Sequence, residues 1–177
     1  LKKDISESYQ RFITYFKYKI FFNGKEATHE RKMIAPINQN IYGVKKSEIT
    51  DLNQILHDKK RFNFFLKIDI EHHEYRILDQ IIKYQTWLTG LVIEFHDIDL
   101  HFEKIKKFIN ELDLQLVHIH VNNFGATNNQ NIPTVLEATF SPSGYNTIRE
   151  INDNKFPING LDQPNNKKEI DEPIIFE

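Results

Sequence analysis

Three apolar runs, separated by segments of helical spacing, constrain the fold more than any other feature of this sequence. The runs cover residues 64–70, 91–95 and 114–121, and each has the length of a buried strand. Between them, apolar residues recur at helical spacing in residues 77–82 and 102–112. Strands and helices that alternate in this way indicate right-handed crossovers and a parallel sheet with helices on both faces. The predicted fold class is therefore α/β.

The segment before the first run gives weaker patterns. Residues 4–16 have the spacing of a helix whose aromatic residues are expected in the core, and residues 17–22 alternate like a short strand. A polar connection follows, in which a short strand is expected near Ile41. Residues 49–56 then predict a short amphipathic helix with Thr50 as its cap.

The end of the chain predicts one more strand and an irregular segment. Residues 134–140 follow a loop without a helix signature, so they are expected to form an antiparallel partner of the strand before them. Beyond residue 141 the chain is rich in Asn, Pro and Gly. The expected organisation is an α/β domain over residues 1–140 and a tail, residues 141–177, packed on the same domain.

Composition excludes several kinds of protein. The 23 basic and 25 acidic residues give a formal net charge of -2, which suggests neither a nucleic-acid-binding surface nor a polybasic membrane anchor. The absence of cysteine excludes disulfides, thiolate zinc sites and cysteine nucleophiles, and it fits a cytoplasmic setting. No apolar run approaches the roughly 20 residues that a membrane span needs. A small or neutral molecule is the expected partner.

Polar side chains gather where the three predicted strands end. Ligands of open α/β sheets bind beyond the carboxyl ends of parallel strands, so these positions are the first candidates for chemistry. Because side chains alternate along a strand, residues two apart share a face. In chain order, the candidates are Asp69, Glu71, His72, His73 and Glu74, then Glu94, His96, Asp97 and Asp99, then His118, His120, Asn122 and Asn123.

Two interpretations of these residues stay open. In the first, they converge on one pocket, where a histidine acts as general base and carboxylates hold a divalent metal or orient hydroxyl groups. In the second, acids just past a strand cap the next helix, which is the favoured interpretation for Glu74 and Asp99. For Asp69 the functional interpretation is favoured. An acid directly after a buried strand costs folding free energy unless a ligand or an ion pair offsets it. A metal site of His118, His120 and His96 is a further alternative.

The segment of residues 65–78 resembles the FkbM-type methyltransferase family. The family signature is a strand that reads Lys-Ile-Asp-x-Glu-Gly, followed by an acidic and apolar helix start, and Lys67, Asp69 and Glu71 match it in order and type. The resemblance continues through the later predicted strands and covers roughly residues 42–140.

This resemblance implies a Rossmann-like class I methyltransferase sheet, mostly parallel with an antiparallel last strand. It implies S-adenosylmethionine as the methyl donor and a hydroxyl of a sugar or other small metabolite as the acceptor. Carried over by position, Lys67, Asp69 and Glu71 are the expected cofactor-binding residues. Asp69, His96 and Glu94 are the expected catalytic residues, with His96 as base. Asp69, Glu71 and Glu94 would be the ligands of a divalent metal.

The sequence departs from the family at two places. His72 stands where the signature has glycine, which adds a side chain at a point of close backbone approach. In addition, no glycine-rich turn occurs before residue 63, so the amino-terminal part of the fold is expected to lie outside this chain, or donor binding has been lost. The alternatives are a non-catalytic module that binds a glycan or a protein, and a metal-dependent hydrolase.

Overall fold

The computed structural model describes residues 2–23, 27, 29–35, 41–59, 63–142 and 155–174. The chain divides into two compact units, Leu1–Met33 and Ile34–Glu177. The first unit consists largely of one helix, whereas the second contains the main sheet. In the described residues, no helix is both long enough and apolar enough to cross a membrane.

The helix of the first unit is α1 (Lys2–Phe22), which runs without a break for 21 residues. The strand predicted at residues 17–22 is therefore wrong. Each residue added to a formed helix gains a backbone hydrogen bond, and this gain outweighs the weak strand preference of six alternating residues. The expected burial of the aromatic residues is also wrong, since Tyr9, Phe12 and Phe16 are exposed. At 100° per residue the aromatic side chains of α1 surround the axis instead of forming one face.

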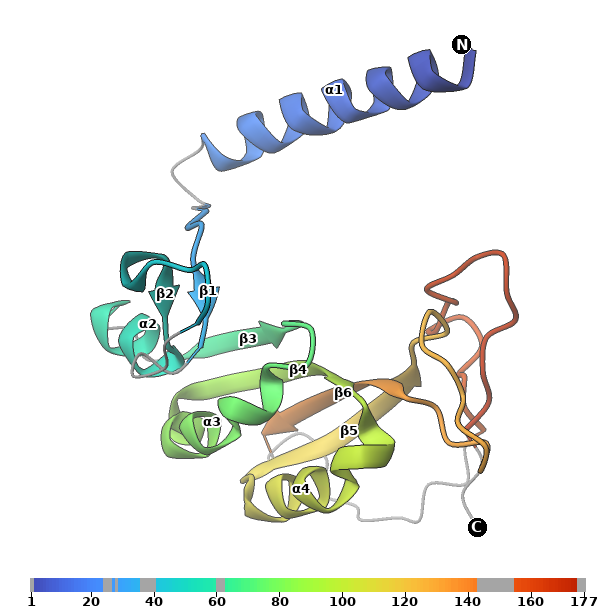
Figure 1. Ribbon diagram of the computed structural model, residues 1–177. Coiled ribbons are helices and arrows are strands. Elements are labelled where there is room, and N and C mark those ends of the chain that lie inside the picture. The colour runs from blue at the N-terminus through green and yellow to red at the C-terminus, as the bar shows by residue number, and fades with distance from the viewer. Residues whose placement is uncertain are drawn as a thin grey trace. The chain divides into compact units, whose positions relative to one another are not determined.

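The main sheet of the second unit has four strands in the order β3-β4-β6-β5. They are β3 (Phe64–Ile68), β4 (Leu88–His96), β5 (Leu114–Val121) and β6 (Val135–Pro142). β3 pairs in parallel with β4, and β6 pairs antiparallel with both β4 and β5, so β3, β4 and β5 share one direction (Figure 1). The α/β class and the antiparallel last strand are confirmed. The insertion of β6 between β4 and β5 was not predicted.

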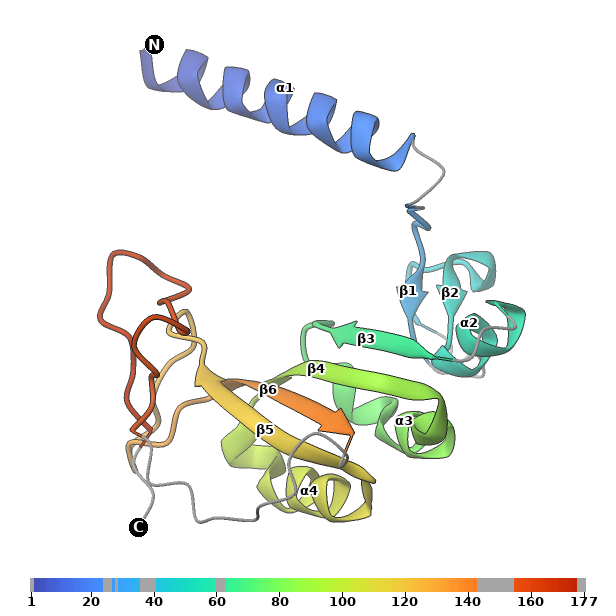
Figure 2. The same ribbon diagram turned by 180° about the vertical axis from the view of Figure 1, so that it is seen from behind.

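Two helices connect the strands and cover one face of the sheet. α3 (Leu78–Tyr84) follows β3, and α4 (Ile98–Glu111) follows β4. Figures 1 and 2 show both helices on the same face, where they contact each other. The expectation that the connecting helices lie on both faces is thus wrong for α3 and α4. Two successive right-handed crossovers that advance in one direction place their helices on one side.

The buried core lies between this pair of helices and the sheet. Leu91, Ile93 and Phe95 of β4 are fully buried, and they alternate with Val92, Glu94 and His96 on the other face. β6 contributes Ala138 and Phe140, which pair with Ile93 and Leu91 in the ladder. The face away from α3 and α4 is therefore the polar face of the sheet.

Short elements precede and join these strands. A two-stranded sheet pairs β1 (Met33–Ile34) with β2 (Ile49–Thr50), and the described residues near Ile41 form no strand. The cap of α2 (Leu52–Lys59) is Asp51 and not Thr50, because Asp51 Oδ1 accepts a hydrogen bond from Gln54 N at 2.7 Å. Single turns of 3₁₀ helix are η1 (Lys46–Glu48), η2 (Glu74–Arg76) and η3 (Gln85–Trp87).

Candidate functional site

The carboxyl ends of β3 and β4 bring Asp69, Glu94 and His96 together. Ile68 pairs with Ile93 in the parallel ladder, so the residues that follow each of them, Asp69 and Glu94, lie at the same edge of the sheet. One ligand atom from each of Asp69, Glu94 and His96 lies within 4.8 Å of the other two, and this is the only such group among the described residues. The three residues predicted to be catalytic therefore lie close together at this edge of the sheet.

The turn after β3 fixes the position of His96 by buried polar contacts. Glu74, which has no exposed surface, accepts a hydrogen bond from His96 N at 2.7 Å and contacts His96 Nδ1 at 3.1 Å. The hydroxyl of Tyr75 donates a hydrogen bond to the carbonyl oxygen of His96. Both backbone groups and one ring nitrogen of His96 are thus held by two consecutive residues of η2.

The interpretation of Glu74 as a helix cap is therefore wrong. The residue before η2 is His73, and no side chain caps this short helix. The buried Tyr75, Ile77 and Leu78 that follow place Glu74 inside the molecule, where it faces a strand instead of a helix end. The sequence did contain a signal of this burial: Glu74 stands at the start of a largely apolar segment, and the residues of such a segment are expected in the core.

The opposite side of the imidazole faces carboxylates. His96 Nε2 lies 3.2 Å from Glu94 Oε1 and 3.5 Å from Glu71 Oε2. The side chain of Glu71 is 79% exposed, whereas those of His96 and Glu94 are largely buried. Nε2 thus faces Glu94 and the exposed side chain of Glu71, so this nitrogen lies on the open side of the imidazole.

Carboxylates lie side by side across the polar face of the sheet. Glu94 pairs with Glu137 of β6 in the ladder, and Asp69 flanks it on the other side. Burial raises the pKa of Glu94, and the charges of Asp69 and Glu137 raise it further. A hydrogen bond from Asn122 and the imidazole of His96 act in the opposite direction on this pKa. The third predicted strand end thus reaches the site through Asn122.

Left-handed backbone turns follow β3 and β4. Glu71 and His72 have φ values of 50° and 71°, and Asp97 has a φ of 50°. The φ of His72 is in the region that favours glycine, which explains why a family signature has glycine at this position. The imidazole of His72 is directed to Asp97, with Nδ1 at 3.0 Å from Oδ2, and its ring centroid is 4.8 Å from that of His96.

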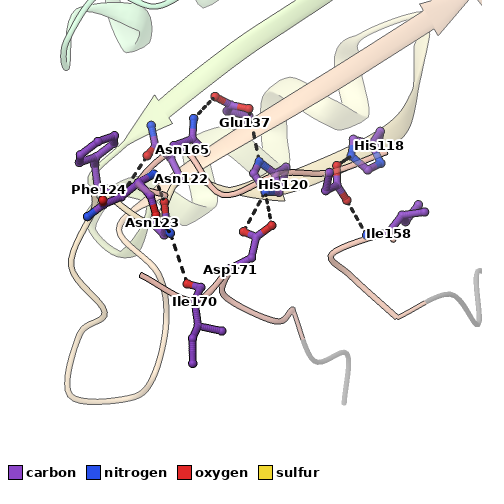
Figure 3. A network of polar contacts seen from close by, with 12 residues as sticks. His118, His120, Asn122, Asn123, Phe124, Glu137, Ile158, Asn165, Ile170 and Asp171 are labelled. Atoms are coloured by element: carbon purple, nitrogen blue, oxygen red, sulfur yellow. Dashed lines mark hydrogen bonds and ion pairs between the residues drawn. The ribbon is translucent and has the colours of Figure 1, made fainter. Parts of the chain in front are cut away.

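The histidines of β5 anchor the tail instead of joining His96. His118 Nε2 lies 2.7 Å from Asp162 Oδ1, and His120 Nε2 lies 3.0 Å from Asp171 Oδ1 (Figure 3). The alternative metal site of His118, His120 and His96 is therefore not formed in the described part of the chain. His120 also lies 3.5 Å from Glu137, so the charged row of the polar face continues from Glu94 to the tail.

Asn123 fixes the tail by its side-chain amide. Its Oδ1 accepts a hydrogen bond from Asn166 N at 2.6 Å, and its Nδ2 donates to Asn166 O at 3.1 Å. Asn165 donates to Glu137 Oε1 at 3.1 Å (Figure 3). The asparagines near the end of β5 thus bind the protein's own backbone and side chains.

The predicted cofactor and metal residues are only partly brought together. Lys67 and Asp69 are exposed residues that share one face by strand alternation, and Glu71 is exposed in the turn beyond them. Of the predicted metal ligands Asp69, Glu71 and Glu94, the close group contains Asp69 and Glu94, and His96 takes the place of Glu71.

Comparison with known proteins identifies the family of this chain. The sequence model of the methyltransferase FkbM domain matches residues 6–125. No curated protein matches the chain. The match includes the signature strand β3, its turn, β4 and β5, and it begins well before residue 42, where the resemblance was expected to start. It therefore gives no support to the expectation that the amino-terminal part of the domain lies outside the chain. Because the match covers more than half of the sequence, the chain belongs to the methyltransferase FkbM domain family.

Proposed function

We propose that the protein transfers a methyl group from S-adenosylmethionine to a hydroxyl of a sugar or another small metabolite. Membership of the FkbM family supports methyl transfer in general. The observation that carries the proposal is the buried Glu74–His96 pair, which directs Nε2 of an imidazole to the ends of the signature strand and its neighbour. A fixed imidazole beside carboxylates is suited to removing a proton from an acceptor hydroxyl.

When no metal ion is bound at the site, Nε2 of His96 is the general base. The acceptor oxygen approaches the methyl group in line with the departing sulfur, and its proton passes to Nε2. Glu74 stabilises the imidazolium that forms, because its carboxylate contacts Nδ1 in an environment without solvent. Asp69 and Glu94 orient the acceptor hydroxyl.

Lys67, Asp69 and Glu71 are proposed to contact the methyl donor. They lie at the carboxyl end of β3, which is where ligands of open α/β sheets bind. The arrangement of β3, β4 and β5 in one direction, with β6 reversed, supports a Rossmann-like sheet of the methyltransferase type. The left-handed turn at His72 supports a close backbone approach by the ligand, since its imidazole is directed to Asp97. A cytoplasmic location is proposed from the absence of cysteine.

Isothermal titration of S-adenosylmethionine into the full chain tests this function. Binding heat is expected in the parent and in Glu103→Gln, which changes an exposed acid of α4, and it is expected to be lost in Asp69→Ala. Conversion to S-adenosylhomocysteine with a panel of sugars and small hydroxylated metabolites then identifies the acceptor. No binding heat in the parent chain would favour a non-catalytic glycan- or protein-binding module on the same fold.

A further inference from the structure

We infer that Asp69, Glu94 and His96 bind a divalent transition-metal cation through one oxygen of each carboxylate and Nε2 of the imidazole. The inference deepens the proposed function and rests on it only for the role of the cation in methyl transfer. The binding itself is argued from the geometry, the charge and the surroundings of these three side chains.

The geometry suits one ion. The three candidate ligand atoms lie within 4.8 Å of one another. Nitrogen and carboxylate ligands bind a divalent ion at roughly 2.0–2.2 Å, so ligands of one ion are about 3–4 Å apart. Rotation of the Asp69 and Glu94 side chains is proposed to bring their oxygens to this separation.

The second observation is the buried group behind the imidazole. Histidines that bind metals usually donate their other ring nitrogen to a carboxylate or a carbonyl, which fixes the ring and its tautomer. Glu74 contacts His96 Nδ1 at 3.1 Å and is completely buried. Its other oxygen, Oε2, is buried without a hydrogen-bond partner among the described residues. A buried carboxylate with one oxygen unpaired needs positive charge nearby, and a cation on Nε2 supplies it.

The negative charge of the carboxylates around the imidazole also favours a bound cation. Asp69, Glu94 and Glu137 lie across three neighbouring strands, and Glu71 faces the imidazole from the turn. In the described part, no lysine or arginine forms an ion pair with Asp69 or Glu94, and His96 is the basic group that Glu94 contacts. Like charges directly opposite each other destabilise a sheet. One divalent cation offsets this repulsion better than a single proton on His96 does.

The ligand chemistry selects the class of ion. Magnesium and calcium prefer all-oxygen sites, whereas a set of one imidazole and two carboxylates suits manganese, iron or zinc. A cation here would lower the pKa of an acceptor hydroxyl beside it. With such a cation bound, Nε2 would be its ligand and the base would be water, which would take the hydroxyl proton. The methyl group would leave the sulfonium for the hydroxyl oxygen, with S-adenosylhomocysteine as the other product.

Manganese binding tests the site without any methyl donor. The full chain is dialysed against a chelator, and free Mn²⁺ is followed by electron paramagnetic resonance. One saturable site is expected, from which Zn²⁺ displaces Mn²⁺ and Mg²⁺ does not. Asp69→Asn and Glu94→Gln are each expected to lower the affinity by more than about tenfold, and Glu74→Gln by about 10- to 100-fold, the range found for groups that orient metal ligands. Glu103→Gln is the matched control and leaves the affinity unchanged.

Two outcomes would overturn the inference. One is the absence of saturable binding in the parent chain, and the other is binding that Asp69→Asn and Glu94→Gln both leave unaltered. Thermal melting of every variant identifies any that fail to fold, and exposed Asp69 is the position least expected to disturb folding. The titration with S-adenosylmethionine distinguishes failure of the two proposals. Metal binding without donor binding contradicts the proposed methyl transfer alone. Donor binding without metal binding contradicts this inference alone.

Discussion

The Glu74 carboxylate binds the backbone amide and Nδ1 of His96, a residue that is 22 positions farther along the chain. With the hydrogen bond from Tyr75 to the His96 carbonyl, this contact ties the turn after β3 to the end of β4. The end of β4 is therefore fixed by buried polar contacts as well as by the sheet ladder. The stability of the fold and the orientation of the imidazole depend on the same side chain.

Replacement of Glu74 is expected to lower stability. Glu74→Ala leaves the amide of His96 buried without an acceptor, and the loss of a buried hydrogen bond to a charged group costs about 1.5–3 kcal/mol. Glu74→Gln keeps one acceptor oxygen and is expected to lose less. Urea denaturation measures both free energies of unfolding. A value for Glu74→Ala within about 0.5 kcal/mol of the parent would contradict the buried contact.

Tyr75 is expected to make stability sensitive to alkaline pH. Burial raises the pKa of Tyr75 above its ordinary value of about 10, and the charges of Glu74, Asp97 and Asp99 raise it further. The phenol therefore contributes stability that is fully present below about pH 10 and is lost as the pH rises toward its folded pKa. Comparison of the parent with Tyr75→Phe from pH 8 to 11 checks this. The difference in unfolding free energy between them should shrink above about pH 10.

Glu94 is expected to oppose folding at neutral pH. The raised pKa of Glu94 means that its protonated form favours the folded state at acidic pH, and that this contribution is lost as the pH rises through the folded pKa. Glu94→Gln should therefore raise the melting temperature at pH 7 more than at pH 4. Added Mn²⁺ should raise the melting temperature of the parent and not that of the variant. Equal effects of the substitution at both pH values would contradict the charge argument.

The turn at His72 is expected to accept glycine. Glycine adopts the φ of 71° without strain, and the contact of His72 with Asp97 is solvent-exposed and contributes little. His72→Gly should leave the unfolding free energy within about 1 kcal/mol of the parent, whereas the β-branched His72→Val should lower it by about 1–2 kcal/mol. Equal stabilities for the two variants would argue against a left-handed conformation at this residue.

The tail is expected to loosen when its histidine contacts are removed. A His118→Ala and His120→Ala double variant loses the contacts to Asp162 and Asp171, which hold residues 155–174 to β5. Hydrogen exchange of the Asp162 and Asn166 amides should become about tenfold faster, since each is hydrogen-bonded within this docked arrangement. Lys168→Ala is the control. Unchanged exchange in the double variant would show that the tail is held by other contacts.

The sequence predicts most of the strands and the close approach of three polar residues at the strand ends. Parallel strands that end in acid or histidine meet at one edge by geometry, so the meeting of Asp69, Glu94 and His96 follows from their positions after apolar runs. Glu74 was missed because its role depends on a contact with a residue of another strand, which a local cap signal cannot show. The place of β6 between β4 and β5 was missed for the same reason, because pairing on both sides of a strand is a long-range property.

The alternation of apolar and polar side chains along β4 and β6 also favours one pairing register of these two strands. Glu94 and Glu137 lie opposite each other on the polar face, and their neighbours Ile93 and Ala138 lie opposite each other in the core. A slip of either strand by one residue would turn a carboxylate into the apolar interior and an apolar side chain out to water. Misaligned sheets are therefore heavily penalised, and the acids of the site help to select the correct alignment while the chain folds.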